Sequence, residues 1–264
     1  MNPQTKPIVC DTNIWYRLSD GRIEPQEVKG KQLIGTYLSA HEFACTPNAL
    51  NHYDLFRGAV TMFRSLPVTT YQEDPTEYIK RVSNLEFKIP QWVRIDKSLD
   101  VVEKSAELTV TAEVRQQYAN YDAELKKLFE PFEDMIKRHR GRIQSRKQHK
   151  AAMNRTQSRA DHKEITKQVI TDLSGGGSLN WEKLELFLNT FDEWIRQLSI
   201  QPDLRMNPND WNDVMNLVYV QPGSLYWTCD ERKTKQYIHN IGLGHYLYDY
   251  DCKAMQGRNN LVVS

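Results

Sequence analysis

Two short apolar segments each end directly at an aspartate, and this feature constrains the fold most. Residues 8–10 (Ile-Val-Cys) precede Asp11, and residues 225–229 precede Asp230. Short apolar runs of this kind are typical of buried strands, and a stretch of helical composition follows each of them. Strands that alternate with helices predict a parallel sheet. Because the carboxyl ends of parallel strands open onto one crevice, we expect Asp11 and Asp230 to be neighbours.

Local patterns predict further elements in the first part of the chain. Residues 42–45 form a second short strand candidate, and residues 245–250 form a last one near the C-terminus. A helix is expected to follow Thr46 and Pro47 as far as Arg64, because threonine can cap a helix and proline is favoured in its first turn.

The middle of the sequence differs from both ends. Residues 96–167 have a charged, strongly helical composition without a strand signal, which predicts a long helical hairpin or arm. Three glycines at 175–177 break the chain, and apolar residues then recur at helical spacing over 184–198. We interpret that stripe as a packing face.

The bulk properties fit one α/β core that carries a large insertion. The 264 residues are 39% hydrophobic and 26% charged, with a net charge of +1, which is ordinary globular composition. We expect residues 1–95 and 178–264 to form the two halves of the core. Residues 96–177 would form a basic helical insertion or arm.

The chain also lacks the signals of several other classes of protein. It has no apolar core of a signal peptide and no run long enough to span a bilayer. Its four cysteines lack C-x-x-C spacing, which argues against a zinc knuckle and against a secreted disulfide framework. These observations predict a cytoplasmic protein without a membrane partner.

Four aspartates could converge at the carboxyl edge of the expected sheet. Asp54 lies in the helix that follows the second strand candidate, and Asn207-Pro208 predicts the start of another helix that carries Asp213. Together with Asp11 and Asp230 they would form a cluster whose charges repel unless a cation intervenes. Carboxylate oxygens suit Mg²⁺ or Mn²⁺, and such an ion can activate water and neutralise charge during phosphodiester hydrolysis.

These pieces resemble the PIN-domain nuclease family. The similarity lies in residues 9–13 (Val-Cys-Asp-Thr-Asn), in residues 54–59, in Asp213, and in residues 228–230 (Thr-Cys-Asp). It covers roughly residues 8–65 and 205–250, and Asp54 stands where the family usually has a glutamate. The resemblance implies a PIN-like three-layer fold with a small parallel sheet, and an endonuclease that uses Mg²⁺ or Mn²⁺.

The resemblance also implies roles for individual residues. Asp11, Asp54, Asp213 and Asp230 would be the catalytic, metal-binding carboxylates. Asn13 would orient Asp11, and Thr228 would line the site. Asp210 and Glu231 are auxiliary candidates, although a solvated first-turn charge is the simpler interpretation of Asp210.

A basic run in the predicted arm suggests contact with nucleic acid. Between positions 137 and 167 there are eleven lysines and arginines but only two acidic residues. Such a segment favours sequence-tolerant binding to a phosphate backbone, although charge runs also form solvated faces or dock acidic partners. The candidate nucleic-acid contacts are Arg57, one helical turn from Asp54, and Lys137, Arg138, Arg140, Arg142, Arg146, Lys147 and Lys150.

The sequence therefore predicts a metal-dependent endonuclease that acts on RNA in preference to DNA. A toxin-like ribonuclease restrained by an inhibitory protein partner is one setting that the family analogy offers, and a homo-oligomer is an open alternative. The competing hypothesis is a non-catalytic nucleic-acid-binding or scaffold protein with a degenerate PIN-like fold. A phosphatase with Asp11 as its nucleophile is a third.

Overall fold

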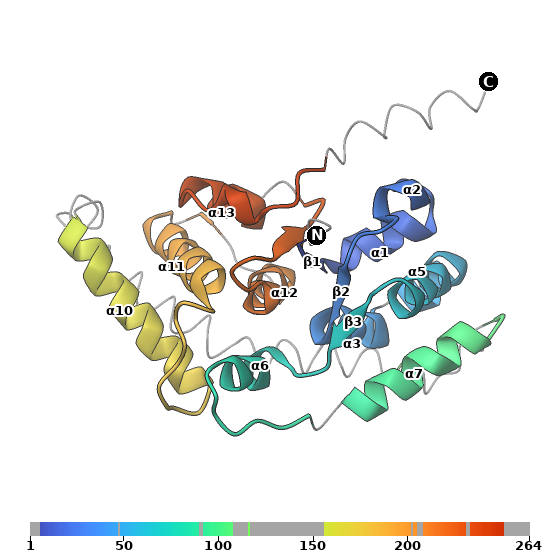
Figure 1. The fold of residues 1–264 in the computed structure, drawn as a ribbon, viewed down its shortest axis with the longest axis horizontal. Helices are drawn as coiled ribbons and strands as arrows, with labels where there is room; N and C mark the ends of the chain where they lie inside the picture. Colours follow the sequence, from blue (N-terminus) through green and yellow to red (C-terminus); the bar gives the residue numbers. More distant parts are fainter. Residues whose placement is uncertain are drawn as a thin grey trace, which may run out of the picture.

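A small parallel β-sheet lies at the centre of the protein (Figure 1). The computed structural model describes residues 6–46, 48–89, 92–107, 116, 156–201, 203–204, 208–230 and 233–250. Within these ranges the sheet has four strands in the order β3-β2-β1-β4. Their bounds are β1 (Ile8–Cys10), β2 (Leu33–Thr36), β3 (Thr69–Tyr71) and β4 (Leu225–Trp227). All three neighbouring pairs are parallel.

The pairing of β1 with β4 joins the N-terminal and C-terminal parts of the sequence. Val9 pairs with Tyr226, and Cys10 with Trp227, so the two strands end at the same level. Both strands are largely buried, as expected for the interior of a parallel sheet. The prediction of an α/β fold with a small parallel sheet is confirmed. Residues 245–250 contribute only a bridge from Leu247 to Tyr226, so their prediction as a strand is wrong.

Helices cover both faces of this sheet (Figure 1). Helices α1 (Thr12–Ser19) and α5 (Tyr53–Ser65) pack together on one side, and α11 (Glu185–Ile200) and α12 (Pro208–Asn216) pack together on the other. The remaining helices are α2 (Pro25–Val28), α3 (Tyr37–Cys45), α4 (Asn48–Asn51), α6 (Pro75–Val82), α7 (Trp92–Lys104), α10 (Thr156–Leu173) and α13 (Thr234–Asn240), with short 3₁₀ turns η1 (Leu217–Tyr219) and η2 (Gly244–Tyr246). No helix in the described part of the chain is long and apolar enough to cross a membrane.

The prediction of a strand at residues 42–45 is wrong, because these residues form the last turns of α3. The second strand lies earlier, at β2, and the chain turns into α3 immediately after it. Thr36 fixes that boundary, since its side-chain oxygen accepts a hydrogen bond from the backbone N–H of Ser39 at 3.2 Å. This is a helix N-cap, which satisfies a donor that the first turn leaves free.

The helix expected up to Arg64 is divided in two. Helix α4 ends at Asn51, and α5 begins at Tyr53. His52 lies between them with a non-helical φ of −142°. By contrast, the apolar stripe at 184–198 lies in α11 and is largely buried, which confirms its interpretation as a packing face.

Helix α5 packs so closely on β2 that one strand position has no room for a side chain. A Cβ atom on Gly35 would stand 2.8 Å from a ring carbon of Phe63 and 2.8 Å from the hydroxyl oxygen of Thr70. We therefore expect Gly35→Ala to destabilise the fold by about 1–3 kcal/mol, the usual cost of overpacking a core. Urea unfolding measures this. Thr69→Ala, at an exposed strand position, is the control, and equal stability of the two variants would contradict the close packing.

Candidate functional site

Asp11 is the first residue after β1, and its position is fixed from several directions. Its backbone N–H donates to the carbonyl oxygen of Trp227 at 2.9 Å, which continues the pairing of β1 with β4. Its Oδ1 accepts from the backbone N–H of Thr12 at 2.7 Å and so caps α1. Only 7% of the residue is exposed. Asp11 is therefore a buried carboxylate held at the carboxyl edge of the sheet.

A hydrogen-bond network ties Asp11 to the segment that follows β4. Its Oδ2 accepts from the Asn13 amide at 2.6 Å and from the Thr228 hydroxyl at 2.7 Å. The Asn13 amide oxygen accepts from the backbone N–H of Cys229 at 3.2 Å, and the Thr228 hydroxyl oxygen accepts from that of Asp230 at 3.1 Å. The two post-strand segments are thus fastened side by side, as the sequence predicted for Asp11 and Asp230.

The electrostatics of Asp213 show that more than two carboxylates gather here. Burial raises the pKa of Asp213 to about 9, and repulsion from Asp11, Glu42, Asp230 and Asp210 adds to the effect. Burial also raises the pKa of Asp11 to about 6, with a further increase from Asp230 that hydrogen bonds from Thr228 and Thr12 oppose. Carboxyl groups from distant parts of the sequence therefore share one poorly solvated region.

Glu42 is the member of this cluster that sequence reasoning missed. It lies on α3 and accepts a hydrogen bond from the Asn212 amide of α12 at 3.2 Å. Burial raises its pKa to about 7, and Asp11 is the charge that raises it further. The signal was present in the sequence, because Glu42 belongs to the helix that follows the second strand. Assigning residues 42–45 to a strand concealed it.

The structure does not bring Asp54 into the acidic cluster, because Asp54 is not among the charges that act on Asp11, Glu42 or Asp213. Asp54 is exposed in the first turn of α5, where its charge adds to the burial that raises the pKa of Tyr53. Arg57 lies near the same tyrosine and lowers that pKa. The physical reason is the break at His52, which starts α5 at Tyr53 and leaves Asp54 at an open helix end.

Asp210 is not the solvated charge that the sequence suggested. It is 8% exposed, and both of its carboxylate oxygens accept hydrogen bonds from the Lys233 ammonium, at 2.8 and 2.7 Å. The pair joins α12 to the start of α13. Glu231 lies outside the described residues, as do the basic candidates Lys137, Arg138, Arg140, Arg142, Arg146, Lys147 and Lys150.

The cysteines beside the two post-strand aspartates differ from each other. Cys10 is free and buried within β1. Cys229 stands between Thr228 and Asp230 and is disulfide-bonded. The spacing of the cysteines argued against a secreted disulfide framework, and a disulfide at Cys229 does not test that expectation.

The carboxylate oxygens of this cluster are ligands that a hard cation prefers, although they do not form a complete coordination shell. In the described ranges, no three His, Cys, Asp or Glu side chains are arranged closely enough to hold a metal ion. Both oxygens of Asp11 instead accept hydrogen bonds from neighbouring groups. The chemistry of the donors fits Mg²⁺ or Mn²⁺, because carboxylates that raise one another's pKa are relieved by a divalent ion.

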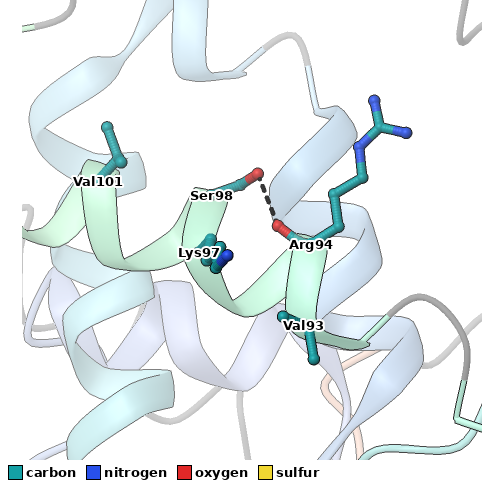
Figure 2. Close-up of a pocket in the computed structure, with 5 residues that line it drawn as sticks. All are labelled: Val93, Arg94, Lys97, Ser98 and Val101. Carbon is teal, nitrogen blue, oxygen red and sulfur yellow. Dashed lines mark hydrogen bonds between the residues drawn. The ribbon is translucent and has the colours of Figure 1, made fainter.

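A separate, open pocket lies on the outer face of α7. It is lined by Val93, Arg94, Lys97, Ser98 and Val101, which follow one another along one side of the helix (Figure 2). The Ser98 hydroxyl donates to the carbonyl oxygen of Arg94 at 3.0 Å and is therefore engaged by its own helix. These lining residues bring no carboxylate, so the pocket is distinct from the acidic cluster.

Comparisons with protein-family models, with curated proteins and with solved structures found no match to this chain.

The raised pKa values predict how stability depends on pH. In the folded protein the pKa values of Asp11, Glu42 and Asp213 are about 6, 7 and 9. In EDTA, the protonated carboxyls therefore contribute their full stabilisation of the folded state below about pH 4. This contribution is lost as the pH rises through those three values. We expect Asp213→Asn to raise the melting temperature at pH 8.5 by about 3 °C or more, with a smaller gain at pH 5. Differential scanning calorimetry measures both.

Asp54→Asn is the matched control, because it makes the same substitution at an exposed position. Its unfolding should follow the wild-type pH profile. If Asp213→Asn lowers the melting temperature at pH 8.5 as much as at pH 5, the crowding of carboxyl groups around Asp213 is contradicted.

Proposed function

We propose that the protein is a metal-dependent endonuclease with a PIN-like fold, which hydrolyses phosphodiester bonds in RNA in preference to DNA. One observation carries the proposal: Asp11, Glu42, Asp213 and Asp230 come from four separate segments and act on one another at the carboxyl edge of the sheet. Such a concentration of charge is costly to a fold, and a cation site is the function that accounts for it.

The chain's own groups prepare this site for a cation. Asn13 and Thr228 both donate to one oxygen of Asp11, which fixes the direction of that carboxylate. The carboxyls of Glu42 and Asp213 hold protons near neutral pH, so cation binding would displace protons and draw the side chains together. When bound, Mg²⁺ or Mn²⁺ supplies an activated water and neutralises charge on the phosphate.

The position of Glu42 supports the PIN-like interpretation. The family resemblance implies a glutamate in a helix after an early strand, and the sequence analysis assigned Asp54 to that role. Glu42 lies in α3, directly after β2, and its charge acts on Asp213. The acidic residues then follow the family order along the chain, as Asp11, Glu42, Asp213 and Asp230.

A non-catalytic nucleic-acid-binding protein is the second candidate. The observation in its favour is that both oxygens of Asp11 are engaged by internal hydrogen bonds, as they would be in a site that serves only to hold the fold. A cytoplasmic location, an inhibitory protein partner and a homo-oligomeric state stay predictions from the sequence.

Site-directed variants test the proposed activity directly. We expect Asp11→Asn, Glu42→Gln, Asp213→Asn and Asp230→Asn each to reduce Mn²⁺-dependent RNA cleavage by about 100-fold or more, because each removes a charge that would hold the ion. Gel analysis of a mixed RNA and DNA panel, with Mn²⁺ and with EDTA, measures the rates.

The exposed Asp54 again provides the control, and Asp54→Asn should cleave at the wild-type rate. RNA binding by Asp11→Asn, followed by filter retention, should persist while cleavage is lost. Cleavage that survives in EDTA or in Glu42→Gln would contradict the proposal. Binding without cleavage by the wild-type protein, in the presence of Mn²⁺, would favour the non-catalytic candidate.

A further inference from the structure

Helix α7 turns an apolar and basic surface to solvent. Val93 and Val101 lie eight positions apart on one side of the helix and are 62% and 63% exposed, although valine is usually buried in a folded protein. Arg94 and Lys97 lie between them in the sequence and are also exposed (Figure 2). These four residues are called the α7 face. Exposed apolar side chains grouped in this way are typical of an interaction surface.

The acidic side chains of α7 are held away from this face. Arg64 on α5 forms ion pairs with three of them at 2.8, 3.6 and 2.8 Å, and these are Asp96, Asp100 and Glu103. In the described part of the chain, no ion pair involves Arg94 or Lys97. The α7 face therefore carries a positive charge that its own helix does not neutralise.

Helix α10 shows the reverse arrangement. Ile165 and Leu173 have the same eight-residue separation as the two valines and are 56% and 49% exposed. Glu164 and Asp172, which precede them directly in the sequence, are exposed as well. We call these four residues the α10 face. Asp172 accepts a hydrogen bond from the neutral Gln168 amide at 2.8 Å, which does not neutralise the charge of its carboxylate.

The basic side chains of α10 are mostly engaged on its other side. Arg159 and Lys163 reach polar side chains of α11, at 3.7 and 2.6 Å. Lys167 pairs with Glu164 at 2.6 Å and offsets part of the negative charge, although the Glu164 side chain is still 69% exposed. The α10 face is therefore apolar and acidic, where the α7 face is apolar and basic.

The two faces do not meet within one molecule. Helix α7 packs on α3 and α5, whereas α10 packs on α11. Figure 1 shows the two helices at opposite margins of the fold, with α10 at the left and α7 at the lower right. A contact between the α7 face and the α10 face therefore requires two copies of the chain.

We propose that the protein associates with itself, the α7 face of one copy binding the α10 face of the next. The equal spacing lets the apolar pair of one face lie against that of the other, while charges of opposite sign meet beside them. Because the two faces differ, the contact is head to tail and leaves a free face at each end of the assembly. Two helix faces form a small interface, so the association is weak and depends on concentration.

Analytical ultracentrifugation measures this association without requiring any activity. We expect the average mass of the wild-type chain at low salt to rise with concentration past that of a dimer. High salt should return it toward the mass of one chain, because the charges are screened.

Charge reversal tests which surfaces are in contact. The α7 reversal combines Arg94→Glu with Lys97→Glu, and the α10 reversal combines Glu164→Lys with Asp172→Lys. Each variant alone should be monomeric, because both of its faces then carry charge of the same sign. An equimolar mixture should associate again, because each face of one variant meets a face of opposite charge on the other.

Lys29→Glu with Lys183→Glu is the matched control, since it makes the same change in net charge at exposed positions outside both faces. It should associate as the wild-type chain does. Circular dichroism checks that each variant is folded. If a double reversal is unfolded, Lys97→Glu and Asp172→Lys replace the two doubles, and each should weaken association that their mixture recovers.

Three results would overturn the inference. The first is a wild-type chain that stays monomeric at low salt and high concentration. The second is a folded reversal variant that associates by itself, or a mixture of the two that does not recover association. The third is an α7 reversal that loses RNA retention on filters while its self-association is unchanged, which would assign the α7 face to a phosphate backbone.

Discussion

The hydrogen bond from Thr228 to Asp11 is the contact on which the rest of the site depends. It joins residues 217 positions apart, at 2.7 Å, directly beyond the paired ends of β1 and β4. Asn13 reinforces it by contacting Asp11 and the backbone of Cys229. Because the two post-strand segments cannot separate without breaking this network, the charges of Asp11 and Asp230 are held near each other.

The grouping of these carboxyl groups lowers the stability of the folded state. Grouped carboxyl groups in a buried region raise one another's pKa, and the fold retains them although uncharged side chains would pack with less cost. Sites at which a sequence accepts such a local conflict are usually functional. The Lys233–Asp210 pair offsets part of the charge at one margin, while Asp11, Glu42 and Asp213 keep their repulsion. The remaining charge is the part that a divalent ion would neutralise.

The sequence predicted the elements that local patterns determine. The strands before Asp11 and Asp230 were recognisable as short apolar runs, and parallel topology then placed the two aspartates at one edge. Strand β2 was missed, since Leu33–Thr36 reads Leu-Ile-Gly-Thr and offers only two strongly apolar residues before a glycine. Glu42 was missed with it, and Asp54 was chosen in its place. The Lys233–Asp210 pair depends on tertiary packing of two helices, which no local pattern encodes.

The central claim is that Asp11, Glu42, Asp213 and Asp230 form one cation site. Crystals soaked in MnCl₂ and measured at the manganese absorption edge would test it most directly. The account predicts an anomalous peak within about 2.0–2.3 Å of oxygens from Asp11 and at least one of the other three carboxylates. An anomalous map without a peak among these residues, or with manganese bound at Asp54 instead, would contradict it.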